Sequence, residues 1–168
     1  GVIERAQFAR VDKDSFRDLI LHVTGRGDDS RLLLLLNKKG RGFEIGKENK
    51  TARIAKGEVL FFGAGDFNAD FSDDIVIIQK ADGKNFASIL FNNKKGYFYN
   101  KVDYFLPEIL PGIDRVKLVD LDHDRDLDLF FYGEKVMTPA GRPHPNQSQV
   151  FINNGQGEFQ DLSTILLT

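Results

Sequence analysis

The chain has 168 residues, of which 41% are hydrophobic and 29% are charged, and this composition suits one folded domain with a water-soluble surface. Its longest apolar run, residues 32–36, is far shorter than the roughly 20 residues that a membrane-spanning helix needs. A formal net charge of −2 provides no general attraction to nucleic acid. The absence of cysteine excludes disulfides, thiol catalysis and zinc–thiolate sites.

An acidic stretch that leads into an apolar strand occurs three times along the chain. The three stretches are residues 10–18, 66–74 and 120–128. Each ends on an aspartate, and these last aspartates are 56 and then 54 residues apart. Self-similarity at a nearly fixed period indicates a repeat architecture.

A second marker follows each acidic stretch at a similar distance. It is an Asn- and Gly-containing turn that ends on a phenylalanine, in residues 37–43, 92–98 and 153–159. Such a turn between two strand-like runs indicates a β-hairpin. The third repeat is longer because of residues 137–147, which contain Pro and Gly and which we expect to form a loop insertion.

Each repeat contains four candidate strands, and no window shows the sustained 3.6-residue periodicity of a helix. In the middle repeat these strands are predicted at residues 58–64, 74–80, 87–93 and 96–105. The runs 32–36 and 75–78 are apolar on both faces, as expected for strands sandwiched between neighbouring sheets.

Four strands in a repeat of this length are typical of one blade of a β-propeller. The predicted fold class is therefore all-β, with three tandem four-stranded blades in a single propeller segment. The predicted blades span approximately residues 5–50, 57–106 and 113–166.

The combined pattern resembles a known repeat family. An Asp-x-Asp/Asn-x-Asp-x-x-x-Asp loop before an apolar strand, followed by Asn-Asn-Gly-x-Gly-x-Phe, is similar to the FG-GAP/VCBS repeats. The resemblance spans essentially the whole chain. It implies a β-propeller of the integrin-α head type, with calcium bound in the loops between the first and second strands. It does not imply one activity, because the family includes adhesion heads, lectins and accessory domains of enzymes.

The second and third acidic loops meet the chemical demands of calcium, which takes six to eight oxygen ligands at roughly 2.3–2.6 Å. Residues 66–74 contain four acids and no base, while residues 120–128 contain five aspartates and one arginine. Such loops would repel themselves without a cation. Matching the family pattern predicts two ions, with ligands Asp66, Asn68, Asp70, Asp74 and the Ser72 carbonyl for one, and Asp120, Asp122, Asp124, Asp128 and the Asp126 carbonyl for the other.

An alternative interpretation is that these loops are polar turns whose aspartates bond their own backbone. The family usually has glycine at the sixth loop position, where the chain turns sharply. This sequence has Ser15, Phe71 and Arg125 there. Because a side chain at positive φ is strained, we expect altered loop geometry or metal affinity.

The first acidic loop differs from the others because Arg10 occupies its first ligand position. The remaining acids are Asp12, Asp14 and Asp18, and the loop has no net charge. We expect no metal here. Two interpretations stay open: the Arg10 guanidinium replaces the ion and pairs with these carboxylates, or the site is lost and Arg10 points to solvent.

Other motifs carry weaker signals. The tripeptide Arg26-Gly27-Asp28 matches an integrin-binding sequence but is most simply a polar turn. Basic residues recur at two hairpins, and they either contact an acidic glycan or lipid head group or guard solvent-facing turns. These residues are Lys38, Lys39, Arg41, Lys94 and Lys95. The histidines, His22, His123 and His144, show no catalytic or metal-binding spacing, although His144 lies in the long insertion.

A segment of three blades cannot close a ring, since propellers typically close with 4 to 8 blades. The chain is therefore expected to be a fragment of a larger propeller, or to be completed by further copies or by other protein chains that cover its open blades. The predicted function is a calcium-stabilised, non-catalytic module for protein binding, scaffolding or adhesion. No nucleophile and base pair is visible that would indicate an enzyme.

The alternative function is a lectin-like carbohydrate-binding module, or an accessory domain of a polysaccharide-active enzyme. Tyr97, Tyr99 and Tyr104 would then stack on sugars in place of the missing tryptophans. Because calcium is plentiful outside the cytoplasm, we expect an extracellular, periplasmic or luminal location. The chain starts at Gly1 and shows no signal peptide, which is either absent or already removed.

Overall fold

The structure is a computed structural model that describes residues 1–25, 30–45, 58–100, 106, 109–110, 112–133 and 148–163. Twelve strands in this part of the chain form three four-stranded antiparallel sheets, each built from strands that are consecutive in sequence. The all-β prediction is therefore confirmed. No helix among the described residues has the length and apolar character needed to cross a bilayer.

Each sheet corresponds to one sequence repeat. The first sheet contains β1 (Val2–Ala9), β2 (Asp18–Thr24), β3 (Ser30–Asn37) and β4 (Phe43–Ile45). The middle sheet contains β5 (Glu58–Gly65), β6 (Asp74–Ala81), β7 (Lys84–Asn92) and β8 (Phe98–Asn100). The third sheet contains β9 (Arg115–Val119), β10 (Asp128–Tyr132), β11 (Ser148–Asn153) and β12 (Phe159–Asp161).

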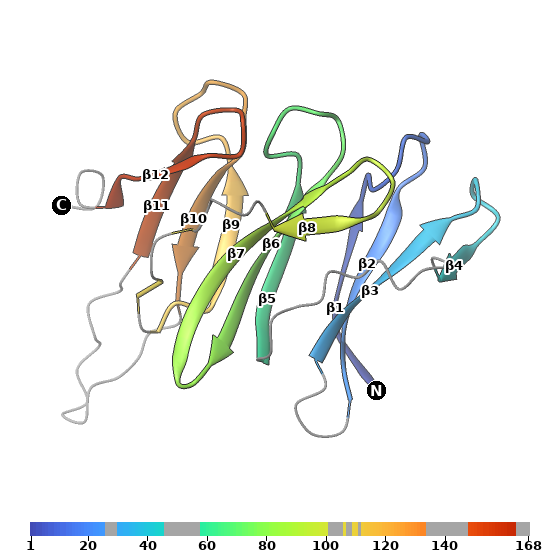
Figure 1. Cartoon of the computed structure of the whole chain (residues 1–168), viewed down its shortest axis with the longest axis horizontal. Helices are drawn as coiled ribbons and strands as arrows, with labels where there is room; N and C mark the ends of the chain where they lie inside the picture. The colour runs from blue at the N-terminus through green and yellow to red at the C-terminus, as the bar shows by residue number, and fades with distance from the viewer. Residues whose placement is uncertain are drawn as a thin grey trace.

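The middle sheet lies between the other two (Figure 1), and the first strands of the three repeats are neighbours, because β5 contacts both β1 and β9. The Gln7 side chain fixes β1 to β5: its amide nitrogen donates to the Ala64 carbonyl at 3.0 Å, and its oxygen accepts the Ala64 N–H at 3.2 Å. Register shifts occur at corresponding points, between Ile3 and Arg5 and between Val59 and Phe61. The first two repeats therefore share this irregularity of strand pairing as well as their sequence pattern.

The alternation of side chains along β6 explains why the middle sheet is buried on both faces. Ile75 and Ile77 pack in a core with the first sheet, whereas Val76 and Ile78 pack in a second core with the third sheet. The prediction for residues 75–78 is confirmed. These β-branched residues also have a high strand propensity, so local preference and burial agree.

The corresponding prediction for residues 32–36 is only half right. Leu32 and Leu34 are buried against the middle sheet, but Leu33 and Leu35 on the opposite face are only partly buried. The physical reason is that the first sheet has a neighbouring sheet on one side only within the described residues. The fourth strand of the middle repeat begins at Phe98 and not at residue 96 as predicted, and the rest of the predicted strand, residues 101–105, lies outside the described residues.

Glycine allows the closest approach between sheets. Gly157, at φ 75°, lies so near the middle sheet that an added Cβ would collide with the Phe91 ring. Gly83 has nearly the same φ, 77°, but an added Cβ there would meet no atom within 4 Å. Both positions therefore have a backbone conformation that favours glycine, but only at Gly157 would a side chain also collide with a neighbouring residue.

We predict that Gly157→Ala destabilises the protein by about 1–3 kcal/mol more than Gly83→Ala, because only the former overpacks the boundary between two sheets. Urea unfolding of both variants beside the parent chain measures this difference. Equal losses would show that the Gly157 contact contributes nothing beyond its backbone conformation.

Candidate metal centre

The three acidic loops lie at one end of their sheets, beside the hairpins (Figure 1). We call residues 10–18, 66–74 and 120–128 loops 1, 2 and 3, and residues 37–43, 92–98 and 153–159 hairpins 1, 2 and 3. Each loop connects the first and second strands of its sheet, and each hairpin connects the third and fourth. This is where the sequence analysis places the calcium sites.

The last aspartate of each loop has the same buried role in all three repeats. In loop 2, Asp74 is fully buried and accepts the N–H of Phe67 at 3.2 Å and the N–H of Asn92 at 2.8 Å. The corresponding carboxylates of loops 1 and 3, Asp18 and Asp128, each accept two backbone N–H groups from matching positions. These aspartates therefore join the loop, the second strand and the hairpin.

Burial changes the acidity of these carboxyl groups. Desolvation raises the pKa of Asp74 to about 7, although its two backbone N–H partners oppose the shift. Burial also raises the pKa of Asp18 and of Asp128. A cation in loop 2 would favour the ionised form of Asp74 and so reverse this penalty.

Loop 3 brings together three of the predicted ligands. Asp120, Asp122 and Asp124 each offer a carboxylate oxygen within 4.8 Å of the others, the only such group of three acids or histidines among the described residues. The Oδ1 atoms of Asp120 and Asp126 are buried without a hydrogen-bond partner. Burial and neighbouring acids raise the pKa of Asp126 to about 6. The convergent group does not include the carboxyl of Asp126, whose carbonyl was the predicted ligand.

Loop 2 has a related but less acidic arrangement. Asn68 Oδ1 is buried without a hydrogen-bond partner, at a predicted ligand position. Asp66 accepts the N–H groups of Asp70 and Phe71 at 3.0 and 2.7 Å. Lys94 of hairpin 2 places its Nζ 3.7 Å from an Asp70 oxygen, so a lysine already offsets part of the negative charge.

The sixth loop position adopts the left-handed conformation in loops 2 and 3. Phe71 has φ 69° and Arg125 has φ 82°, whereas Ser15 of loop 1 is not at positive φ. The N–H groups of Phe71 and Arg125 donate to the first acid of their loop, at 2.7 and 3.2 Å. A charge-assisted hydrogen bond of this kind contributes about 1.5–3 kcal/mol, enough to offset the strain. Loop 1 has Arg10 instead of an acid and lacks this acceptor.

Arg10 forms a contact that neither sequence interpretation included. Its guanidinium lies 3.5 Å from Asp73 of loop 2, which is the ion pair that Arg10 forms in the described part of the chain. Arg10 N–H also donates to Asp73 at 2.8 Å, and Asp73 N–H donates to the Arg10 carbonyl at 2.7 Å. Asp12 and Asp14 instead accept backbone N–H groups within loop 1. Loop 1 is therefore linked to loop 2 by this reciprocal pair.

Two asparagines join neighbouring sheets, and the sequence analysis recognised them only as turn residues. Asn92 Nδ2 donates to the Val11 carbonyl in loop 1, and Asn153 Nδ2 donates to the Phe67 carbonyl in loop 2, both at 2.8 Å. Both side chains are buried. Their recurrence at the start of each hairpin was the available signal, but it did not identify an acceptor in the preceding repeat.

The remaining candidates that the structure describes form separate local contacts. His22 is buried with its Nε2 2.8 Å from Ser30 Oγ, and burial lowers its pKa. Lys38 forms an ion pair with Glu44, and Lys94 pairs with Asp70 as described. The Arg26-Gly27-Asp28 tripeptide, His144 and the predicted insertion lie outside the described residues.

Comparison with known proteins adds no assignment. No protein-family model matches the chain, and a search of curated proteins finds no match. The candidate sites therefore depend on the residues and the geometry given above.

We predict that Asp74 gives the metal-free protein a defined pH dependence. Its folded pKa of about 7 exceeds the ordinary 3.8, so its contribution to stability is full below pH 3.8 and is lost as the pH rises to about 7. Unfolding in chelator, below, within and above this window, should show the stability difference between the parent chain and Asp74→Asn decreasing with pH. A difference that is constant with pH would contradict the raised pKa.

Proposed function

We propose that the chain is a calcium-stabilised segment of a β-propeller of the FG-GAP/VCBS type, which serves as a non-catalytic binding or scaffolding module. The arrangement in series of three four-stranded sheets, with β5 between β1 and β9, supports the propeller part of this proposal.

The observation that carries the calcium part is the set of unpartnered oxygens. Asn68 Oδ1, Asp120 Oδ1 and Asp126 Oδ1 are buried without a hydrogen-bond donor, and they lie within the two loops predicted to bind an ion. A buried acceptor without a partner costs free energy, so an oxygen-seeking cation is a fitting occupant. Asp66, Asp70, Asp122 and Asp124 would complete the two ligand sets.

The proposed mode of action is presentation of the loop surface to another protein. Phe71, at the tip of loop 2, has 81% of its surface exposed. It borders an open groove of about 380 Å³ between loops 1 and 2, which Arg10 and Lys13 also line. An exposed aromatic side chain beside charged groups suits protein recognition. An exported location with plentiful calcium is part of the same proposal.

We predict that calcium raises the thermal unfolding midpoint relative to chelator. A ligand at 100 times its dissociation constant adds about 2.7 kcal/mol per site. Asp122→Ala should lose the part of this shift that belongs to loop 3. Asp12→Ala is the matched control, because Asp12 holds the same position in loop 1 and makes the same bond, to the N–H two residues later.

The control keeps the full calcium shift if the ions bind loops 2 and 3. The absence of a shift in the parent chain, or an equal loss in both variants, would contradict calcium binding at these loops. Magnesium in place of calcium tests selectivity, since its smaller ion demands a stricter octahedral arrangement.

Carbohydrate binding is a second candidate, favoured by two exposed aromatic side chains. Tyr97 and Tyr99 are 52% and 45% exposed at hairpin 2 and β8. Tyrosine rings offer an apolar face and a polar hydroxyl to a sugar. Tyr104, which was expected to contribute, lies outside the described residues.

If this second function holds, a glycan array should show selective binding that Tyr97→Ala weakens. Phe86→Ala is a suitable control, because Phe86 is comparably exposed, at 45% against 52% for Tyr97, but lies on β7. Binding that is absent, or that is unchanged in Tyr97→Ala, would leave protein presentation as the proposed function.

A further inference from the structure

The two boundaries between sheets use corresponding positions of the repeat. The middle sheet packs Ile75, Ile77, Leu90 and Phe98 toward the first sheet. The third sheet packs Leu129, Phe131, Phe151 and Phe159 toward the middle sheet at the matching positions. Each boundary also has one asparagine amide bonded to a loop carbonyl, as described for Asn92 and Asn153. One mode of packing therefore occurs twice.

The free face of the first sheet carries Leu19, Leu21, Leu35 and Phe43 at the positions that match these boundary residues. The strand register places Phe8, Leu19, Leu35 and Ile45 in one row across this face. Phe8 is 56% exposed and Ile45 is 58% exposed. Phe43, which matches the buried Phe98 and Phe159, is also exposed. This face thus has the residues of a boundary without a neighbouring sheet among the described residues.

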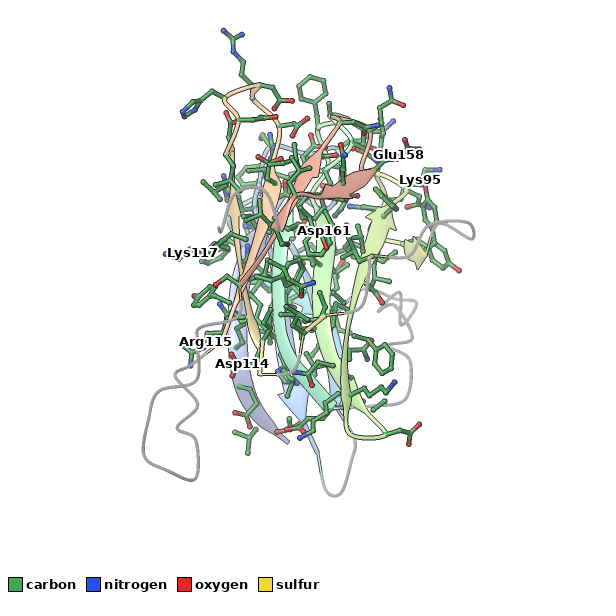
Figure 2. All side chains as sticks on the ribbon, turned by 90° about the vertical axis from the view of Figure 1, so that its left-hand side faces the viewer. Lys95, Asp114, Arg115, Lys117, Glu158 and Asp161 are labelled. Carbon is green, nitrogen blue, oxygen red and sulfur yellow. The ribbon has the colours of Figure 1, made fainter. Side chains whose placement is uncertain are left out.

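The free face of the third sheet carries the residues of the opposite side of such a boundary. This face is turned toward the viewer in Figure 2. Leu121 matches Val11 and Phe67, the buried loop residues that accept the two asparagine amides, but Leu121 is 37% exposed. Phe130 stacks on Tyr132 on this face, and Lys117 lies 5.8 Å from the Tyr132 ring. In Figure 2, Lys117 and Arg115 lie along β9 at one edge of the sheet.

Charge favours contact between these two free faces. Hairpin 1 exposes Lys38, Lys39 and Arg41, whereas loop 3 has five aspartates and one arginine. Gly40 matches Gly96 and Gly157, because all three have φ between 75° and 78° and donate their N–H to the asparagine that begins their hairpin. An added Cβ at Gly96 or Gly157 would contact the preceding loop at Val11 or Phe67. In the same packing mode Gly40 would lie beside Leu121, at the start of acidic loop 3, with the basic residues of hairpin 1 next to it.

We propose that two copies of this chain associate head to tail, with the first sheet of each packed on the third sheet of the other. The Asn37 amide, which now donates to the Arg17 carbonyl at 3.0 Å, would donate to the Leu121 carbonyl of the second copy. Two copies supply six sheets, within the 4 to 8 of closed propellers, whereas three copies supply nine. The heterologous contact then closes into a two-fold ring. This inference rests on the proposed propeller arrangement and not on calcium.

Light scattering after size-exclusion chromatography tests the copy number. We expect a mass of about 38 kDa, twice the 19.0 kDa of one chain. Phe8→Lys should reduce the mass to that of one chain, because it places a charge in the apolar row. Phe86→Lys is the matched control and should keep the larger mass, since Phe86 is comparably exposed on β7 of the middle sheet. A 19.0 kDa parent chain, or a species larger than two copies, would overturn the proposal.

Cysteine cross-linking tests the orientation, and the absence of native cysteine makes it specific. An ideal Cβ at Gly157 lies 3.7 Å from the Phe67 carbonyl oxygen, so Gly40→Cys in one copy and Leu121→Cys in the other should be close enough to join. A mixture of the two single variants should form a disulfide-linked pair. Each variant alone, or Lys95→Cys mixed with Leu121→Cys, should not.

A dimer that does not cross-link in the mixture would show face-to-face packing of like sheets and would overturn the head-to-tail arrangement. The calcium experiment separates this inference from the proposed function. A monomer that still gains stability with calcium contradicts the dimer alone, while a cross-linked dimer without a calcium shift contradicts the metal sites alone.

Discussion

The fold depends on one repeated interaction, the buried carboxylate that ends each acidic loop. Asp18, Asp74 and Asp128 each accept one N–H from their own loop and one from the residue that begins the hairpin. A buried donor left without an acceptor costs about 1–3 kcal/mol, so each carboxylate satisfies two such groups at once. These bonds fix the loop, the second strand and the hairpin relative to one another. The other acids of the loop are positioned by this fixed backbone.

The loop acids therefore have two distinct tasks. The last aspartate is fully buried and bonded to the backbone, whereas Asp120, Asp122 and Asp124 converge near the surface with one oxygen unpartnered. A cation bound to the second group also favours ionisation of the first, because positive charge stabilises nearby carboxylates. Metal binding at these loops would therefore be coupled to the stability of the sheet.

The sequence predicts the all-β fold and the three four-stranded sheets, because these follow from the spacing of apolar runs and turn residues. The expectation that the missing loop glycines alter the geometry is wrong for Phe71 and Arg125, which adopt the left-handed conformation. The sequence does not predict contacts between repeats. Arg10 bonds to Asp73, and Asn92 bonds to the Val11 carbonyl, across distances in sequence that no local pattern encodes. Arg10 stands where the other two loops have an aspartate, and Asp73 stands where loops 1 and 3 have Arg17 and Leu127. These two departures from the repeat have opposite charge, which was the available signal for the pair. The function of the loops as metal sites stays a prediction.

The asparagine bonds between sheets also bear on how the chain folds. Asn92 and Val11 are 81 residues apart, and Asn153 and Phe67 are 86 residues apart. Closing such long loops costs entropy before any contact is gained, so they are expected to form late and slowly. During synthesis, the first sheet emerges before its partner in hairpin 2 exists. Its apolar face toward the middle sheet is exposed in that interval, which makes the nascent chain prone to aggregation.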